Sequence, residues 1–219
     1  MIQDFGTDGV IFLARGLMWT LGLSVATFLC GGILGLIFAL GRSLGPRWIR
    51  LPIATYIELV QATPLLIVVF LSFYGLPFFG LYLPPLAAAS LALTLYATAF
   101  LADIWRGCIE AVPRTQWEAS EALGLSGPET LRHVIMPQAI RISLGPTVGF
   151  MVQIVKNTSV TALIGFVELT RAGQLLNNQT FQPFHVFITV ALMYFAICYP
   201  MSLWSEKLKE KRNVDSTAH

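Results

Sequence analysis

The sequence has few charged residues and no residue cluster that would carry enzymatic chemistry. Asp, Glu, Lys and Arg make up 12% of its 219 residues, and the net charge is only +2. The three cysteines and three histidines are scattered along the chain, without the spacing of metal ligands. No basic cluster with interleaved aromatic residues indicates a nucleic-acid surface. We therefore expect neither a metal site nor a nucleic-acid partner.

Motifs for nucleotide or ester hydrolysis are also missing. The chain has no G-x-x-x-x-G-K-[ST] loop to bind phosphates, no G-x-S-x-G elbow and no H-E-x-x-H zinc motif. We expect no catalytic residue and no enzymatic activity in this chain. Any step that uses ATP would have to take place on another chain.

What the chain does contain is long apolar runs. Hydrophobic residues make up 55% of the sequence, far more than in a soluble protein. A run of about 20 apolar residues is long enough to cross a bilayer as a helix. We predict an all-α integral membrane protein, with residues 1–219 forming one domain. The five predicted spans are about residues 17–40, 53–74, 86–104, 138–155 and 184–203.

The distribution of basic residues predicts the orientation. The loop from Gly41 to Leu51 contains Arg42, Arg47 and Arg50 and no acidic residue, so it is expected on the cytoplasmic side. With the N-terminus outside and the C-terminus inside, the 14 basic residues divide 11 inside to 3 outside. That asymmetry supports five spans.

Two of the spans contain helix-disturbing residues. Pro64 is expected to kink the second span. Gly145, Pro146 and Gly149 interrupt the fourth, which predicts a short, broken helix that lines a cavity.

Small residues share one face of the first span. Gly31, Gly35 and Ala39 recur at intervals of four, a spacing that allows close contact with another helix. Glycine is also common in membrane helices generally, and the sequence does not separate these two explanations.

The longest polar interruption lies between the third and fourth spans, within residues 106–137. Pro113 marks a helix start and Gly124 a helix end. Ser126 with Glu129 has the pattern of a capping box that opens a second helix, and Pro137 ends that helix or begins the next. We predict a compact two-helix cytoplasmic knob, with one apolar side, between two membrane spans.

Acidic and basic residues lie at helical spacing just before this knob. Asp103, Arg106 and Glu110 are three and four residues apart, so they can pair along one helix face.

The knob sequence resembles a known family motif. Glu118-Ala119-Ser120, then Gly124, then Val134-Ile135-Met136-Pro137 is similar to the EAA motif of ABC-importer permeases, with Ser where the third residue is usually Ala. Lys156-Asn157-Thr158-Ser159 and Val167-Glu168-Leu169-Thr170-Arg171 resemble the polar amino acid (histidine, glutamine and arginine) branch. The resemblance extends over nearly the whole chain.

The resemblance implies a function and a set of partners. It implies the permease subunit of an ATP-driven, binding-protein-dependent importer of polar amino acids or close derivatives. The partners would be a dimer of ABC ATPase subunits, a second permease (identical or related), an extracytoplasmic solute-binding protein and membrane lipid. ATP and Mg would be bound by the ATPase, with no cofactor in this chain, and the location would be the bacterial cytoplasmic (inner) membrane.

The same resemblance points to coupling residues, and polarity inside the spans points to a pathway. The residues expected to dock on the ATPase are Glu118, Ala119, Ser120, Gly124 and Pro137. For the pathway residues, helix packing, capping or loop closure explains each equally well. The candidates for the substrate pathway are Glu58, Gln61, Tyr96, Thr98, Gln153, Lys156, Asn157, Thr158 and Ser159. Gln61-Ala62-Thr63-Pro64 and Tyr96 depart from the residues usual in this branch, so the specificity of relatives is not transferred.

Two other function classes are compatible with apolar spans. A secondary transporter or channel subunit driven by an ion gradient would need carboxylates deep in its spans, where Glu58 is the single candidate. A passive membrane anchor would leave the polar residues of the second and fourth spans without a role. Neither alternative requires a patterned cytoplasmic knob.

Overall fold

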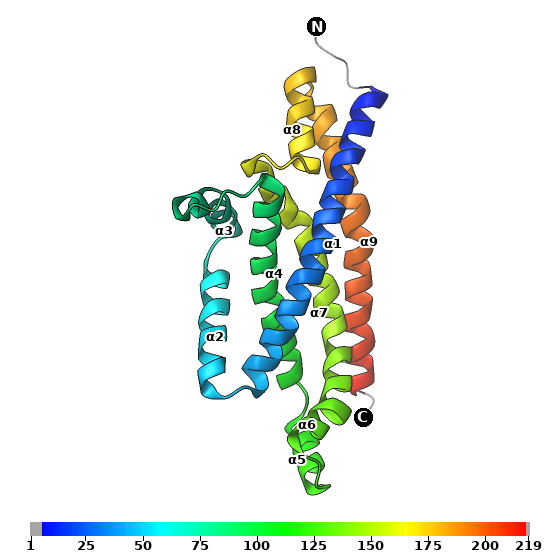
Figure 1. Cartoon of the computed structure of the whole chain (residues 1–219). Coiled ribbons are helices and arrows are strands. Elements are labelled where there is room, and N and C mark those ends of the chain that lie inside the picture. The colour runs from blue at the N-terminus through cyan, green and yellow to red at the C-terminus, as the bar shows by residue number, and fades with distance from the viewer. Residues whose placement is uncertain (1–5, 218–219) are drawn as a thin grey trace.

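The computed structural model describes residues 6–217, with side chains described for residues 6–210. The described chain is helical and forms an elongated bundle (Figure 1). Its helices are α1 (Thr7–Leu44), α2 (Arg47–Ala62), α3 (Leu65–Phe70), α4 (Pro85–Glu110), α5 (Arg114–Ala122), α6 (Gly127–Thr130), α7 (Met136–Asn157), α8 (Leu169–Thr180) and α9 (Pro183–Thr217). Short π and 3₁₀ segments cover Leu71–Gly75, Leu76–Phe79, Leu131–Ile135 and Thr158–Ile164.

The number of membrane-spanning helices agrees with the sequence. Four helical stretches in the described chain are long and apolar enough to cross a membrane: Thr7–Leu44, Pro85–Glu110, Gly127–Ile164 and Pro183–Glu210. The pair Arg47–Ala62 and Leu65–Phe79 passes the same test together, which gives a fifth candidate. The prediction of about five spans in an all-α membrane protein is confirmed.

The second span is broken rather than kinked. α2 ends at Ala62, Thr63 is extended (φ −102°, ψ 129°), and the chain turns by 106° before α3 begins. Pro64 explains the break, because it has no N–H to donate and disfavours helical geometry in the residue before it. The expected kink is therefore a sharp turn, and α3 lies beside the first turns of α4 instead of continuing α2 (Figure 1).

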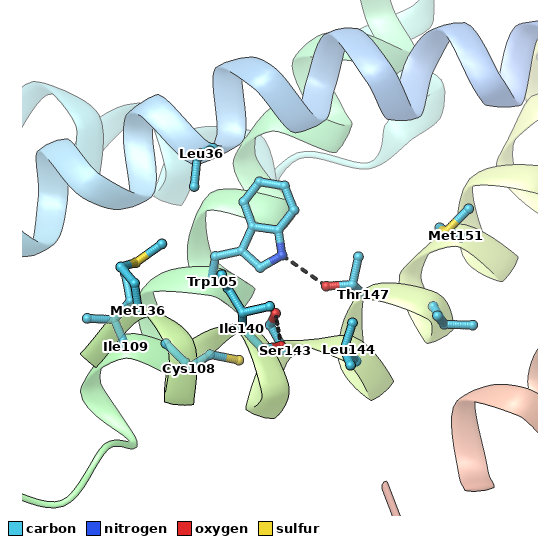
Figure 2. A pocket seen from close by; sticks show the side chains of 12 residues that line it. Leu36, Trp105, Cys108, Ile109, Met136, Ile140, Ser143, Leu144, Thr147 and Met151 are labelled. Atoms are coloured by element: carbon cyan, nitrogen blue, oxygen red, sulfur yellow. Dashed lines mark hydrogen bonds between the residues drawn. The ribbon is translucent and has the colours of Figure 1, made fainter. Parts of the chain in front are cut away.

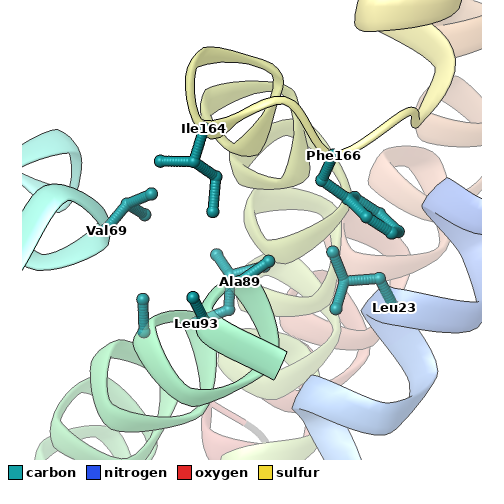
Figure 3. Packing of buried hydrophobic residues seen from close by; sticks show 8 residues of the cluster. Leu23, Val69, Ala89, Leu93, Ile164 and Phe166 are labelled. Atoms are coloured by element: carbon teal, nitrogen blue, oxygen red, sulfur yellow. The ribbon is translucent and has the colours of Figure 1, made fainter. Parts of the chain in front are cut away.

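A hydrophobic cluster holds α3 in this position. Val69 of α3 faces Ala89 and Leu93 of α4, and Ile164 and Phe166 close the cluster from the loop after α7 (Figure 3). Val69 is fully buried. With Leu23 of α1, which belongs to the same cluster, four segments therefore meet at the end of the bundle away from α5 and α6.

The fourth span is a continuous helix, so the prediction of a short, broken helix is wrong. α7 runs through Gly145, Pro146 and Gly149 without interruption. Gly145 and Gly149 face α9 instead: a Cβ on Gly145 would lie 2.7 Å from the Lys209 side chain, and the Gly145 carbonyl accepts a 2.8 Å hydrogen bond from Ser205 Oγ. The glycines thus let α9 come close to α7 at the point where Pro146 removes an internal N–H.

Small residues also bring α1 and α4 together. A Cβ built on Gly31 would lie 2.7 Å from Ala97 Cβ, and one built on Gly35 would lie 3.0 Å from Leu101 Cβ. Ala39, on the same face, is fully buried. The close-contact explanation of this small-residue face is therefore the correct one.

We expect Gly31→Val to destabilise the protein, because the added side chain would force α1 and α4 apart. Overpacking of this kind costs roughly 1–3 kcal/mol. The thermal stability of the detergent-solubilised protein, followed by size-exclusion chromatography after heating, measures the effect. Gly22→Val on the same helix is the matched control, because no heavy atom lies within 4 Å of a Cβ there. Equal melting of the two variants would contradict the assignment.

Candidate functional site

The polar stretch between α4 and α7 folds into a two-helix knob at one end of the bundle (Figure 1). Pro113 precedes the first turn of α5. α5 ends where Gly124 takes a left-handed conformation (φ +75°), and the Leu125 N–H donates to the Ser120 carbonyl at 3.1 Å. Glycine adopts this conformation without steric cost, which is why it ends helices. The predicted end of the first helix is confirmed.

The second helix opens with the predicted capping box. The Ser126 N–H and Ser126 Oγ both donate to Glu129 Oε2, at 2.9 and 2.6 Å. Ser126 also accepts from the backbone of Glu129, which completes the reciprocal arrangement. Pro137 lies in the first turn of α7, so it begins the next helix.

One side of the knob is anchored to the bundle. Trp117 of α5 packs against a buried cluster of Ile109, Val112 and Ile135, to which Ala139 of α7 also belongs. The cluster includes side chains from α4, α5 and α7, so the knob packs directly against two membrane-spanning helices.

The other side of the knob is free in this chain. Glu118, Ala119 and Gly124 are exposed, and Leu123 is 80% exposed at the tip. The exposed Arg114–Glu118 ion pair (3.4 Å) contributes little to stability at a surface. Among the described residues of the knob, Leu123 is the one large apolar side chain exposed at the tip, and small residues lie beside it.

Four of the five predicted coupling residues lie where another chain could reach them. Glu118, Ala119, Gly124 and Pro137 are exposed, whereas Ser120 is 2% exposed and its hydroxyl donates to the Gln116 carbonyl. Ser120 therefore lies on the packed side of the knob. A small residue is needed there because the side chain has little room.

An ion-pair network connects α1 and α4 near the knob. Arg106 pairs with Asp103 (2.9 Å) and with Glu110, as the spacing predicted. Arg42 at the end of α1 reaches the same Asp103 carboxylate at 3.3 Å. Asp103 thus has a structural role, and the contact from Arg42 was not visible in the sequence because it joins residues 61 positions apart.

Part of the predicted pathway set comes together at the other end of α7. The Gln153 amide donates to Asn157 Oδ1 at 3.1 Å, and the Tyr96 side chain of α4 lies near Asn157, whose buried amide nitrogen has no hydrogen-bond partner among the described residues. Tyr96 also packs on Phe100, which stacks on Phe150. Lys156, on the same helix, is exposed. The group combines two amides and a phenol at the junction of α4 and α7.

The remaining pathway candidates lie elsewhere or use their polar groups locally. Thr98 is buried between α1 and α4, and its hydroxyl donates to the Thr94 carbonyl. Thr158 and Ser159 donate to the carbonyls of Val155 and Lys156. Glu58 and Gln61 are exposed on α2.

Glu168, one of the residues of the motif Val167–Arg171, is a buried carboxylate at the start of α8. Glu168 is 0% exposed and accepts the N–H groups of Thr170 and Arg171, each at 2.9 Å. It also accepts from the Tyr194 hydroxyl of α9 (2.8 Å) and, more weakly, from the Thr20 hydroxyl of α1 (3.4 Å). Burial raises the pKa of Glu168, although these hydrogen bonds act in the opposite direction.

Glu168 therefore joins three helices. Thr20 in turn accepts the Leu169 N–H at 3.1 Å, which fixes α8 against α1. The sequence signal was a single acidic residue between an apolar run and a helix start, which is typical of an N-cap. Its partners on α1 and α9 could not be inferred from spacing.

We expect Glu168→Ala to lower the stability of the protein by about 3 kcal/mol, because it removes a helix cap and leaves buried hydroxyl groups without an acceptor. Thermal unfolding in detergent measures this loss. Glu206→Ala on α9, where the side chain is exposed, is the control. A Glu168→Ala protein as stable as the control would show that the buried cluster does not hold the three helices together.

The bundle also has an open apolar groove of about 400 Å³ between α1, α4 and α7 (Figure 2). Leu36, Ile140, Leu144 and Met151 line it, and the Trp105 indole N–H donates to Thr147 Oγ1 at 2.9 Å. The indole and hydroxyl satisfy each other, so the groove offers almost no free polar group to an amino acid. It is unsuitable as the substrate site.

The described residues contain no group of three or more His, Cys, Asp or Glu side chains that could hold a metal ion. Their arrangement defines a multi-pass helical membrane protein with a rigid contact knob at one end.

Comparison with known proteins identifies the family. Residues 31–213 match the model of the binding-protein-dependent transport system inner membrane component, so the chain belongs to this family. It is a membrane component of a transport system and not an enzyme. Membership implies an ATPase partner and a second permease.

Several relatives are amino-acid permeases. The chain is 31% identical over 200 residues to the probable amino-acid ABC transporter permease YckA of Bacillus subtilis, covering 91% of this chain and 88% of the relative. It is 35% identical over 192 residues to the L-cystine permease TcyB of the same organism, covering 87% of this chain and 82% of TcyB. It is 32% identical over 205 residues to the glutamine permease GlnP of Escherichia coli K12, covering 92% and 93%.

Solved structures agree with this assignment. A crystal structure of an amino acid ABC transporter with histidines has a chain that superposes with a TM-score of 0.89 at 30% identity, covering 96% of this chain and all of the other. An inward-facing structure of the MetNI methionine ABC transporter superposes with a TM-score of 0.79 at 18% identity, covering 93% and 97%, and shows the same fold.

Proposed function

We propose that this chain is the permease subunit of an ATP-driven importer of polar amino acids or close derivatives in the bacterial cytoplasmic membrane. The observation that supports it most is the knob of α5 and α6, which is anchored on α4 and α7 and has an unpartnered outer face. The names of relatives with high coverage, which include permeases for glutamine and cystine, support the substrate class.

The proposed orientation places the knob in the cytoplasm. The first turn of α1 and the last turn of α9 lie at opposite ends of the bundle (Figure 1). The knob lies at the same end as the last turn of α9 and the arginine-containing turn between α1 and α2. Basic residues concentrate on the cytoplasmic side of membrane proteins. The N-terminus then faces outside, where a solute-binding protein would deliver substrate to the Tyr96 group.

In this proposal the ATPase dimer, which binds ATP and Mg, grips the outer face of the knob. Ala119 and Gly124 allow close approach and Glu118 makes a polar contact. Because Trp117 is locked into the cluster with α4 and α7, movement of the ATPase shifts these helices between inward-open and outward-open states. Reversing a 1:99 ratio of two states requires about 5.5 kcal/mol, which ATP binding to the partner would supply.

The proposed substrate pathway is based on the opposite charges that a zwitterionic amino acid carries. A zwitterionic substrate needs a cation and an anion or dipoles in a cavity away from lipid. Lys156, Gln153 and Asn157 provide a cation and two amides near the outer end of α7, together with Tyr96. A second permease would provide the same set from the other side, since five spans alone are few for enclosing a pathway.

We expect Gly124→Trp to uncouple ATP hydrolysis from transport without preventing membrane insertion. The indole would project from the outer face of the knob, and a left-handed backbone (φ +75°) is strained for any residue with a side chain. Substrate uptake and ATPase activity in proteoliposomes measure the effect, with a loss of tenfold or more in uptake.

Gly124→Asn is the matched control, because asparagine tolerates this conformation best among residues with side chains. Uptake close to wild type in Gly124→Asn would separate steric blocking from loss of the turn. Normal uptake by Gly124→Trp would contradict the docking proposal.

The proposed substrate class is tested by the ATPase activity of the reconstituted complex, with its cognate ATPase and binding protein, against a panel of amino acids. We expect stimulation by a polar or basic amino acid or a close derivative. Stimulation by none of them in an intact complex would reject the substrate class and leave the permease assignment unchanged. Failure to assemble without another permease would show that the second subunit is a related chain.

A further inference from the structure

The turn between α1 and α2 carries a basic hollow that the transport mechanism does not use. Arg42, Arg47 and Arg50, with Leu51 and Ala54, line an open space of about 420 Å³. It lies at the same end of the bundle as α5 and α6 but on separate helices (Figure 1).

The positive charge of the hollow is only partly neutralised. The Arg42 guanidinium shares the Asp103 carboxylate with Arg106. Among the described residues, Arg47 and Arg50 form no ion pair, and both side chains are exposed. No acidic side chain lines the hollow. It therefore has an excess of positive charge and room for an anion.

The backbone at the start of α2 also favours the binding of an anion in the hollow. α2 begins immediately at the hollow, after Pro46, and no side chain caps its first turn. The N–H groups and the positive end of the helix dipole at Arg47 favour a phosphate group at this position.

Exposed apolar side chains lie on the same turn. Leu51, which lines the hollow, is 58% exposed, and Trp48 and Leu44, close to it in sequence, are 74% and 49% exposed. They lie where the apolar run of α1 ends, which is the depth of the membrane surface, and tryptophan is enriched at that depth. A soluble anion would use the arginines alone, whereas a lipid would also use these apolar side chains.

We propose that this hollow binds the phosphodiester head group of an anionic glycerophospholipid of the phosphatidylglycerol type. The phosphate lies between Arg47 and Arg50 at the start of α2, with Arg42 deeper in the hollow, and the acyl chains lie along Leu44, Trp48 and Leu51. Basic pockets between membrane helices on the cytoplasmic side are suited to such head groups. The lipid would hold the α1–α2 turn at the membrane surface and α2 upright beside α4.

The test uses the full-length permease assembled with its ATPase in detergent micelles, with added phosphatidylglycerol or phosphatidylcholine and native mass spectrometry as the readout. We expect wild type to retain phosphatidylglycerol at least tenfold more strongly than phosphatidylcholine. The double variant Arg47→Gln/Arg50→Gln should lose about tenfold in this retention, because two surface charges are removed.

Two further variants control for charge and folding. Arg47→Lys/Arg50→Lys keeps the charge and should retain most of the binding. Arg141→Gln removes an exposed arginine of α7 outside the hollow and should bind as wild type. The preference of wild type for phosphatidylglycerol is measured without any variant, so it tests the proposal even if the glutamine variant fails to fold.

Any one of four results would overturn the proposal. Equal retention of the two lipids by wild type, or unchanged retention by the glutamine variant, would show that the hollow does not select an anionic lipid. Displacement of phosphatidylglycerol by millimolar inorganic phosphate would assign the site to a soluble anion. Loss of the ATPase from the glutamine variant with unchanged lipid retention would assign the arginines to a protein contact.

Discussion

The requirement that every backbone N–H and C=O find a partner inside the bilayer governs this structure. It makes the spans helical and restricts where the chain can bend. α7 stays helical through Pro146, and Ser205 of α9 donates to the neighbouring Gly145 carbonyl. At Pro64 the helix ends instead. The chain then turns beside the first turns of α4, where the cluster of Val69, Ala89 and Leu93 packs the turn against the bundle.

The two ends of the bundle use polar groups in different ways. At one end, Glu168 draws α1, α8 and α9 together through buried hydrogen bonds, and losing any one of them would leave a polar group unsatisfied. At the other end, a capping box and the left-handed Gly124 shape the knob without burying charge. The first end is therefore suited to rigidity, and the second to contact with another protein.

The family assignment and the fold class were accessible from sequence because both depend on local patterns. Apolar runs give the spans, and Pro113, Gly124 and Ser126 give the knob with its helix ends and capping box. The burial of Ser120 was not accessible. The wheel of α5 places residues around the helix but does not say which side faces the bundle, and that depends on the cluster around Trp117.

The sequence by itself determined that the protein is a helical membrane permease with a two-helix knob between two of its spans, because span length, helix caps and motif spacing are properties of neighbouring residues. Only the tertiary structure decided which roles the glycines and polar residues within the spans have. Gly145 and Gly149 admit α9 rather than breaking α7, and Thr98 packs between helices while Tyr96 meets Asn157. The reason is physical: a glycine or a threonine has several compatible roles, and which one it takes depends on the partner that long-range packing places beside it.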